Sequence, residues 1–455
     1  MVKLRKRVFV GMSGGVDSSV AALLLKEQEY DVTGVYLKCW SQERLDELGV
    51  LGECHSERDA EDARRVAEHI GIPFYVFDFE EEYKKRVVEY MVDGYRAGIT
   101  PNPDVVCNRE IKFGLFLEKA LTLGADYVAT GHYVRLRNTK NIRKYEKEIK
   151  PISYIRKKFV FRSLWQAKDT SKDQSYFLWT LTQEQLKHCL FPIGDYLKSE
   201  VREIARKAGL PTAEKKDSQG ICFLGNVALA DFLKQYLPER EGEVITVEGK
   251  KIGEHEGAHF YTIGQRHLGI SNLKYPTSAK ASAGRQKSKS DGNQKPHYVV
   301  EKDIATNTVV VAEGSDNPAL FRKEVILANV NFINPNDYFL IRANKKAVTM
   351  KVLARVRYRQ PLFEATLIYA DGGWINADGN PHKSVSKSSS IRMVFKDPQK
   401  FVAPGQSAVF YLPAGASAKE GLPSDLSTKA QRVTAGALVK EGREGFEILG
   451  GGVIV

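Results

Sequence analysis

The sequence is poor in two features that define whole classes of protein. No apolar run in its 455 residues approaches the roughly 18 residues that a membrane-spanning helix needs, so we expect no membrane segment. Only five cysteines are present, an odd number without a CxxC pair, which fits neither a secreted disulfide framework nor a zinc ribbon. The basic start MVKLRKR leads into an apolar stretch that soon ends at a polar turn, which indicates a strand and not a secretion signal. We therefore expect a cytoplasmic protein.

Acidic residues are outnumbered as well. The 56 Asp and Glu residues stand against 68 Lys and Arg residues, which leaves a formal net charge of +12. Such an excess favours a polyanionic partner, because Lys and Arg neutralise phosphates and release counterions. Solvated charge on an ordinary basic protein would give the same count, so composition alone leaves both interpretations open.

The pattern of apolar residues changes twice along the chain. Up to about residue 133, short apolar runs alternate with helical patterns, which predicts a parallel sheet with helices on both faces. After Cys222 a short helix and small strands follow, and from Tyr298 onward period-2 segments predict a β-barrel or sandwich. We therefore expect an α/β fold with three domains: an N-terminal parallel-sheet domain over residues 1–222, a small middle α/β domain over 223–297 and a C-terminal β-barrel over 298–455.

Some segments depart from this regular pattern. Residues 271–296 are basic, low in complexity and almost without large apolar side chains, so we expect a disordered or extended insert there. Two further polar inserts are expected near residues 371–391 and 413–442.

The segments LTQEQLKHCLFPIG (181–194) and KSEVREIARKAGLP (198–211) both show the pattern of helices.

The first glycine-rich turn lacks a lysine. Residues 8–19, VFVGMSGGVDSS, combine a β-branched run, a turn of small residues and the start of a helical pattern. A Walker loop needs GxxxxGK[ST] and a dinucleotide fingerprint needs GxGxxG, and neither is present. Backbone N–H groups, the serines and the helix N-terminus can still bind an anion, and Asp17 is placed to help hold Mg²⁺. Such a loop suits pyrophosphate as a leaving group, which predicts transfer of AMP from ATP.

This turn resembles the pyrophosphatase-type ATP loop (PP-loop), SGGxDSS, of GMP synthetase, asparagine and argininosuccinate synthetases and tRNA-sulfurating enzymes. A plain strand-to-helix turn of small residues is the alternative interpretation. The residues expected to bind ATP here are Gly11, Met12, Ser13, Gly14, Gly15, Val16, Asp17, Ser18 and Ser19.

Two of the cysteines lie in loops rich in Pro, Gly, Asn and Asp, where a packing role is less natural. Cys107, in TPNPDVVCNREIKF, is close to an expected helix N-terminus and to Arg109, and both features lower the pKa of a thiol and raise its nucleophilicity. Cys222, in DSQGICF, follows a basic pair that begins at Lys215. Buried structural thiols are the alternative. We prefer that alternative for the other three, Cys39, Cys54 and Cys189.

Together these segments resemble the tRNA-specific 2-thiouridylase (MnmA) family, which includes mitochondrial members. The shared motifs are, in order, GMSGGVDSS, TPNPDVVCN.EIKF, ATGHY, SKDQSYFL, DSQGICF, YTIGQR, RYRQP, PGQSAVFY and LGGGVI, and they cover nearly the whole chain except the inserts. The resemblance implies a PP-loop ATPase domain related to adenine-nucleotide hydrolases. It also implies ATP-dependent 2-thiolation of the wobble uridine of tRNA.

The resemblance further implies catalytic roles. The C2 oxygen of the uridine is adenylated, which makes AMP the leaving group. A persulfide sulfur on Cys222 attacks C2, and Cys107 releases the product, which leaves a Cys107–Cys222 disulfide. Asp104 is the expected acid/base or base-positioning group. As an open alternative, Asp104, Cys107 and Cys222 could bind an iron–sulfur cluster whose vacant iron site holds sulfide.

Binding residues follow from the same resemblance. Leu37 and Gly131 are expected at the adenosine, and Asn102, Pro103 and Asp104 at the flipped uridine. The expected tRNA contacts are His132, Lys172, Asp173, Gln174, Arg357, Tyr358 and Gln406. The partners implied are tRNA for lysine, glutamate and glutamine, and a persulfide donor, either a cysteine desulfurase or a relay protein.

One strand pattern would support RNA binding directly. Arg355, Arg357 and Arg359 alternate, so we expect them to project from one face of a strand and follow a phosphate backbone. A solvated barrel face is the alternative.

Two rival functions also stay open. One is a ligase that adenylates a small substrate, which would need neither the cysteine pair nor the positive charge. The other is an inactive RNA-binding module, against which the intact loop argues.

Overall fold

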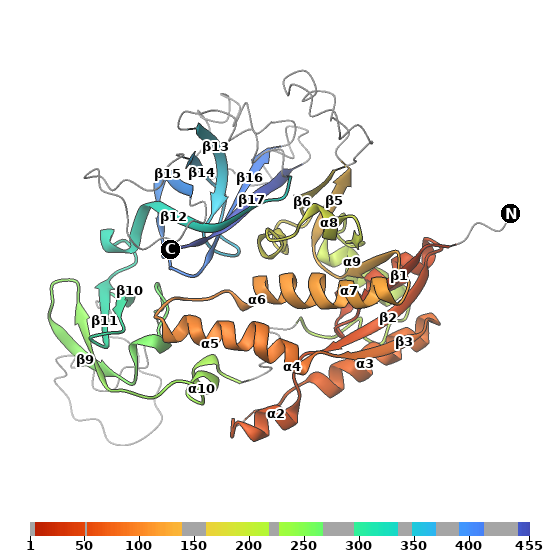
Figure 1. Ribbon diagram of the computed structural model, residues 1–455, viewed down its shortest axis with the longest axis horizontal. Helices are drawn as coiled ribbons and strands as arrows, with labels where there is room; N and C mark the ends of the chain where they lie inside the picture. Colours follow the sequence, from red (N-terminus) through yellow and green to blue (C-terminus); the bar gives the residue numbers. More distant parts are fainter. Residues whose placement is uncertain are drawn as a thin grey trace.

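The computed structural model describes residues 5–50, 52–138, 161–217, 227–266, 295–334, 348–369, 391–413 and 445–455. These residues form three sheets that occupy different parts of the molecule (Figure 1). The expected combination of a parallel-sheet domain, a small middle domain and a C-terminal barrel is confirmed. Within the described ranges, no helix is both long and apolar enough to span a membrane.

Five parallel strands form the N-terminal sheet, in the order β3-β2-β1-β4-β7. They are β1 (Arg7–Gly11), β2 (Asp31–Lys38), β3 (Phe74–Asp78), β4 (Tyr127–Thr130) and β7 (Cys189–Leu190). Successive side chains of a strand point to opposite faces, so Val8 and Val10 pack in one core and Phe9 packs in another. The glycine-rich turn follows β1, the central strand.

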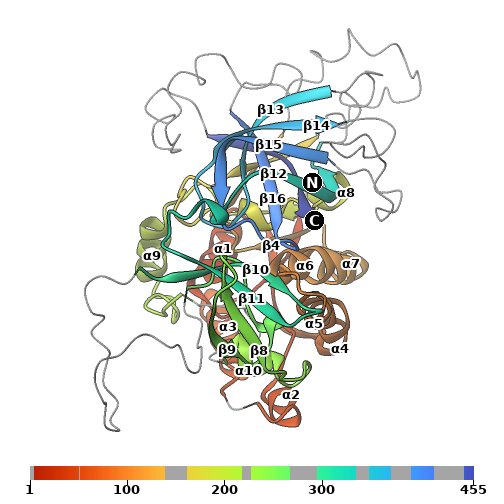
Figure 2. The ribbon, with the colours of Figure 1, turned by 90° about the vertical axis from the view of Figure 1, so that its left-hand side faces the viewer.

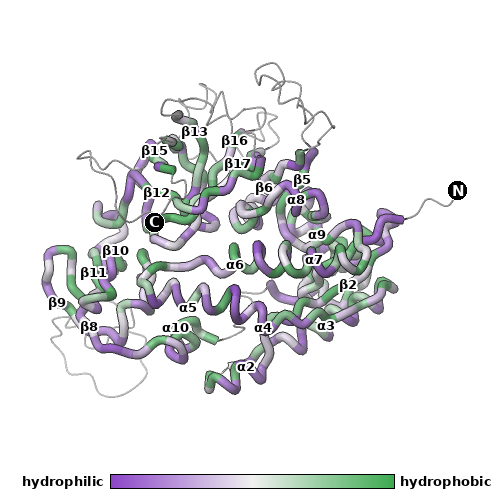
Figure 3. The backbone as a smooth tube through the Cα atoms, in the orientation of Figure 1, coloured by the Kyte–Doolittle hydropathy of each residue, from purple (hydrophilic) through white to green (hydrophobic). Residues whose placement is uncertain are grey.

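Helices cover both faces of this sheet: Figure 2 shows α1, α3 and α9 on one side and α4 to α7 on the other. The first face carries α1 (Val16–Glu27), α3 (Ser56–Ile70) and α9 (Lys198–Lys207). Buried residues of α3 recur at helical spacing, and Figure 3 shows hydrophilic and hydrophobic residues mixed along this helix. These buried residues are Ala63, Val66, Ala67 and Ile70.

The second face is covered by two helical segments that each contain π-helical turns. One consists of α4 (Glu80–Tyr83), η1 (Lys84–Val88) and α5 (Glu89–Arg96), and the other of α6 (Pro103–Val106), η2 (Cys107–Leu115) and α7 (Phe116–Thr122). Their core includes Phe9 and Phe116 and continues into Tyr411 and Phe446 of the barrel. The parallel-sheet domain and the barrel therefore share one hydrophobic core.

The expected helix over residues 181–194 is only partly correct. The helix there, α8 (Gln183–Leu186), is short, and Cys189 lies in β7, which pairs with Val128 and Ala129 of β4. A strand of two residues is too short to show a period-2 pattern, so the apolar residues around it resembled a helix. Two more short helices belong to this domain, α2 (Gln42–Glu47) and the 3₁₀ helix η3 (Ser175–Phe177).

The C-terminal sheet closes on itself through the pairing of β12 with β17, which makes a six-stranded antiparallel barrel. Its strands are β12 (Phe321–Phe332), β13 (Val348–Arg355), β14 (Phe363–Tyr369), β15 (Ile391–Lys400), β16 (Ser407–Pro413) and β17 (Phe446–Ile454), and η5 (Pro318–Leu320) precedes them. Two strands from the N-terminal half, β5 (Val134–Asn138) and β6 (Arg162–Gln166), extend this sheet beside β17.

The middle sheet has the order β10-β11-β8-β9. Its elements are α10 (Leu229–Leu233), β8 (Gly242–Thr246), β9 (Lys251–His255), η4 (Ala258–Phe260), β10 (His297–Asp303) and β11 (Thr308–Glu313). We expected residues from 298 onward in the barrel, but β11 pairs with β8 and so belongs here. Period-2 strands look alike in either sheet, so the pattern could not assign them. The three expected inserts lie almost entirely outside the described residues.

Candidate active site

The turn between β1 and α1 is held in a shape that needs glycine. Gly14 has a φ of +70°, and a Cβ atom there would lie 2.2 Å from the backbone oxygen of Asp59 in α3. Ser18 Oγ accepts a hydrogen bond from the Ser13 N–H (3.1 Å) and donates one to Gly15 O (3.1 Å). No side chain caps the first turn of α1, so its leading N–H groups can serve an anion.

Neighbouring strand ends approach this turn closely. Gly131 follows β4, and a Cβ atom there would lie 2.6 Å from the backbone nitrogen of Ser18. Leu37 is partly buried near the carboxyl end of β2, and the Met12 sulfur packs against Gly34. The carboxyl ends of β1, β2 and β4 therefore meet at the glycine-rich turn, where open parallel sheets bind ligands. That Leu37 and Gly131 contact adenosine stays a prediction.

A cluster of charged side chains surrounds Asp17. Its carboxylate accepts a hydrogen bond from Tyr133 Oη (2.9 Å) and two from Lys198 Nζ (2.7 and 2.8 Å). Lys198 Nζ also lies 2.8 Å from Asp217, which pairs in addition with Lys172 (2.8 Å) and Arg202 (2.8 Å). Burial alone would raise the pKa of Asp217, but its hydrogen bonds with these cations hold that pKa well below the ordinary value. Sequence analysis missed Lys198, because nothing in the α9 pattern marks a residue that reaches the loop.

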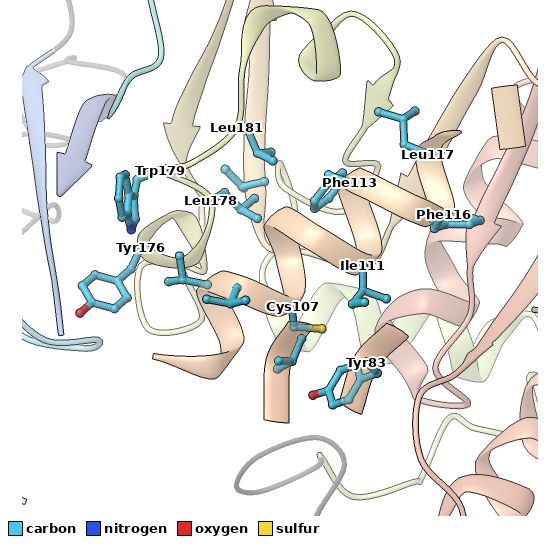
Figure 4. Close-up of a cluster of buried hydrophobic side chains, with 14 of the residues drawn as sticks. Tyr83, Cys107, Ile111, Phe113, Phe116, Leu117, Tyr176, Leu178, Trp179 and Leu181 are labelled. Carbon is cyan, nitrogen blue, oxygen red and sulfur yellow. The ribbon is translucent and has the colours of Figure 1, made fainter. Parts of the chain in front are cut away.

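The segment around Cys107 differs from the expectation. The Asn102 side chain accepts a hydrogen bond from Val105 N (3.3 Å), and the helix already begins at Pro103. Cys107 therefore lies inside a continuous helical segment, and the Arg109 guanidinium pairs with a neighbouring glutamate. The Cys107 side chain is 3% exposed, in the hydrophobic cluster that Figure 4 shows beside Tyr83 and Ile111. Its reaction with a bound substrate would need a local rearrangement that exposes the sulfur.

Burial shifts two titratable groups near this helix. It raises the pKa of Asp104 above the ordinary value, and the charge of Lys112 opposes that shift only in part. Burial lowers the pKa of His132 well below the ordinary value, and Lys112 adds to that effect. His132 is therefore a neutral imidazole at pH 7, packed against Phe113 and Phe191 and hydrogen-bonded through Nδ1 to Thr130 Oγ1 (2.8 Å). A carboxyl with a raised pKa suits proton transfer near neutral pH.

The second expected catalytic cysteine, Cys222, lies outside the described residues. Its proposed partnership with Cys107 is therefore untested, as is a cluster of both thiols with Asp104. Across the parts of the chain that the structure describes, no group of three His, Cys, Asp or Glu side chains is arranged to hold a metal ion.

Comparisons with known proteins assign the chain to a family. A model described as tRNA methyl transferase HUP domain matches residues 6–226, and one described as tRNA methyl transferase PRC-barrel domain matches residues 230–313. The tRNA-specific 2-thiouridylase MnmA of Bacillus licheniformis is 43% identical over 406 residues, which are 89% of this chain and 91% of that protein. The MnmA of Streptococcus pyogenes serotype M2 is 43% identical over 406 residues, 89% and 92% of the two chains. The chain belongs to the tRNA-specific 2-thiouridylase family.

Solved structures add little to this assignment. NMN synthetase from Francisella tularensis matches with a TM-score of 0.25 at 16% identity, over 46% of this chain and 66% of that one. Such a likeness carries no argument. Membership of the 2-thiouridylase family thus rests on the sequence relatives and the family models.

In this 2-thiouridylase, several positions expected to touch tRNA have side chains in internal contacts. Asp173 is 2% exposed and forms an ion pair with Arg355 (2.5 Å). The Gln174 side chain accepts a hydrogen bond from the backbone N–H of Tyr133 (2.9 Å), the tyrosine that donates to Asp17. Lys172 is partly exposed and pairs with Asp217. These three residues therefore connect the region around the ATP loop with the barrel.

The expected stripe of three arginines is wrong. β13 ends at Arg355, whose side chain is buried, and Arg359 has a φ of +63° in the turn that follows. The Arg357 guanidinium is partly buried and donates to Phe401 O (2.9 Å) and to Ile263 O of the middle domain. Alternation in sequence places residues on one face only while the chain is extended. Here the strand stops before the second arginine.

Two remaining positions lie close to the barrel edge. Tyr358 is partly buried, with its ring centroid 4.5 Å from that of Phe177 and the Arg359 guanidinium over its face. Gln406 Nε2 donates to Thr100 O (3.1 Å) and Pro101 O (3.2 Å), directly before the Asn102–Asp104 segment. The barrel therefore holds the loop that precedes the expected uridine site.

Proposed function

We propose that this chain catalyses ATP-dependent 2-thiolation of the wobble uridine of tRNA. The proposal is carried by the glycine-rich turn at the carboxyl ends of β1 and β4, in a chain that is 43% identical over 89% of its length to 2-thiouridylases. The turn supplies N–H groups for phosphates and no Walker lysine, which suits transfer of AMP.

The first half-reaction activates the uridine. Its O2 atom attacks the α-phosphorus of ATP, and pyrophosphate leaves with the electron pair of the broken bond. Asp104 accepts the proton of uridine N3, because a carboxyl with a raised pKa is the stronger base. The ATP contacts proposed are Gly11 to Ser19 with Leu37 and Gly131. Asp17 would hold the Mg²⁺ of the nucleotide, which neutralises phosphate charge.

The second half-reaction transfers sulfur. The terminal sulfur of a Cys222 persulfide attacks C2, and AMP leaves with the bonding electrons. The Cys107 thiolate then attacks the Cys222 sulfur, which forms a Cys107–Cys222 disulfide and releases the uridine sulfur as a thiolate. Asp104 returns its proton to N3, which gives 2-thiouridine. One sulfur atom is thus reduced while two thiols are oxidised, and an external reductant restores them.

Chain connectivity supports a role for Cys222 at this site. Asp217 lies in the charge cluster beside Asp17, and Lys215 pairs with Asp59 and Asp62 of α3. The five residues from Asp217 to Cys222 can span at most about 18 Å. We propose that the Cys222 thiol acts on a substrate held beside this loop.

The tRNA contacts fall into two groups. We propose that Lys172, Arg357 and Tyr358, each partly exposed, contact tRNA directly. Asp173, Gln174, His132 and Gln406 shape that surface through their internal bonds. Asn102, Pro103 and Asp104 hold the flipped uridine. The substrates proposed are tRNA for lysine, glutamate and glutamine, with a persulfide from a desulfurase or relay protein.

Thiolation in vitro tests the proposal. The protein is incubated with ATP, a persulfide-charged desulfurase and unmodified lysine tRNA, and nucleosides are analysed by mass spectrometry. We expect 2-thiouridine and AMP with the wild type, no 2-thiouridine with Cys107→Ser or Cys222→Ser, and normal product with Cys54→Ser. Activity in both catalytic-cysteine variants would overturn the mechanism and favour a ligase for a small substrate. Iron absorbance in active anaerobic protein would favour the iron–sulfur route.

A further inference from the structure

Lys198 brings to the ATP loop the positive charge that the loop's own sequence lacks. It is the first residue of α9, and its Nζ atom lies 2.7 and 2.8 Å from the two carboxylate oxygens of Asp17 in the first turn of α1. The side chain is only 12% exposed, and the Lys198 backbone N–H is fixed by Asp169 (2.9 Å). The Lys198 amine lies between the carboxylates of Asp17 and Asp217 beside the ATP loop, where its donors can also reach a bound phosphate.

Lys198 belongs to a cluster of charged side chains beside the ATP loop. Lys198, Lys172 and Arg202 converge on Asp217, and Lys198 also pairs with Asp17. These three cations lie among three carboxylates, because Asp169 accepts a hydrogen bond from the Lys198 N–H, and they stand next to uncapped N–H groups of α1. Ammonium and backbone N–H donors at one place can bind a polyphosphate together.

Transfer of AMP needs a cation beside the departing pyrophosphate. As uridine O2 bonds to the α-phosphorus, the bond from that phosphorus to the bridging oxygen breaks, and negative charge grows on the departing pyrophosphate. A lysine ammonium is a compact charge with three donors on a flexible stem, so it can follow a leaving group. We propose that Lys198 binds the β-phosphate of ATP and stays with pyrophosphate as it leaves. This inference rests on the proposed function and adds a catalytic residue to it.

The competing explanation is that Lys198 only ties α1 to α9 and to Asp217. Binding of the two products separates the explanations, because pyrophosphate carries the phosphates that Lys198 would hold and AMP does not. Loss of a structural tie would weaken both ligands together. Loss of a phosphate ligand would weaken pyrophosphate alone.

The experiment is calorimetric titration of inorganic pyrophosphate and of AMP into the full-length protein. We expect Lys198→Met to weaken pyrophosphate binding about 10- to 100-fold, as for loss of a charge-assisted hydrogen bond, and AMP binding less than about 3-fold. Lys198→Arg should keep part of the affinity. Lys207→Met, on the same helix at an exposed ion pair with Glu203, is the matched control and should bind both ligands normally.

Three results would overturn the inference: equal weakening of both ligands, unchanged pyrophosphate affinity in Lys198→Met, or no pyrophosphate binding by the wild type. Formation of AMP with tRNA is measured on the same samples. If the wild type forms no AMP with tRNA, the proposed function fails, and the titrations still report on Lys198. If the wild type forms AMP and Lys198→Met matches its rate and affinity, only the inference fails.

Discussion

The ATP loop and the junction around Arg355, where the parallel-sheet domain meets the barrel, are both built on polar contacts. They differ in how far apart in sequence the contacting residues lie. Within the loop, Ser13 bonds to Ser18, five positions away. At the junction, Arg355 pairs with Asp173 across 182 positions. The loop could therefore be identified from a short string. The junction contains equally distinctive strings, and sequence reasoning assigned them to a surface.

The junction teaches that a distinctive motif can serve assembly of the fold. Arg355 donates to Asp173 and Tyr411, and the indole N–H of Trp179 donates to Ser407 Oγ (3.0 Å). These side chains come from the segment before α8 and from the barrel, so they join the two halves of the shared hydrophobic core. We refer to Arg355, Asp173, Ser175 and Tyr411 as the Arg355 cluster.

Breaking the Arg355 cluster should have the largest effect on stability. Arg355→Met leaves the Asp173 carboxylate buried without its cation, which should cost about 3–5 kcal/mol in the free energy of unfolding. Urea denaturation followed by fluorescence measures this. Arg392→Met is the control, because its pair with Glu324 is exposed and should contribute less than about 1 kcal/mol. Similar losses of unfolding free energy in both variants would show that the buried Arg355–Asp173 pair contributes no more than an exposed pair.

A single methyl group should break the ATP loop. At Gly14, alanine would combine a positive φ with a Cβ atom 2.2 Å from Asp59 O, so the loop must move. Misplacement by about 1 Å costs on the order of 100-fold in rate, so AMP formation with tRNA should fall at least that far. The matched control is Gly49→Ala, with a φ of +66° and nothing within 4 Å of its Cβ. Equal activity of both variants would contradict the role of the loop.

The sequence could predict whatever depends on neighbours along the chain. β1, β2, α1 and α3 form the alternation of strands and helices expected before residue 133, because each shows a complete period of buried residues. The loop was predicted because glycine and serine act through the adjacent backbone. Lys198 could not be predicted, since its contact with Asp17 spans 181 positions and depends on how α9 packs against α1. The burial of Arg355 and of Cys107 likewise depends on a core that two domains build together.

Ionised Asp104 should lower the free energy of unfolding, because its carboxylate is buried. Because burial raises its pKa, the folded protein binds this proton more tightly than the unfolded chain does. The stabilising contribution is complete below the unfolded pKa near about 3.9 and is lost as pH rises through the folded pKa. Asp104→Asn cannot ionise, so its free energy of unfolding should rise relative to the wild type between acidic and neutral pH.

Urea denaturation at about pH 4 and pH 8 measures the free energy of unfolding on the acidic and the basic side of the range in which Asp104 affects stability. Asp46→Asn, at an exposed position, is the control and should follow the wild type. The Asn variant should also lose thiolation while it binds ATP. A wild type and an Asp104→Asn variant with the same pH dependence of stability would contradict a shifted carboxyl.

The smallest expected effect comes from the contact that links the barrel to the uridine loop. Gln406→Ala removes two hydrogen bonds to Thr100 O and Pro101 O, which should cost about 1–2 kcal/mol in stability. If Gln406 positions the Asn102–Asp104 segment, kcat for thiolation should fall several-fold while KM for tRNA stays the same. If Gln406 contacts tRNA directly, KM for tRNA should rise while kcat is kept. Steady-state thiolation separates the two, with the exposed Gln235→Ala as control. A rise in KM alone would show that Gln406 acts at the RNA surface and does not position the loop before Asn102, although it bonds to that loop in the free protein.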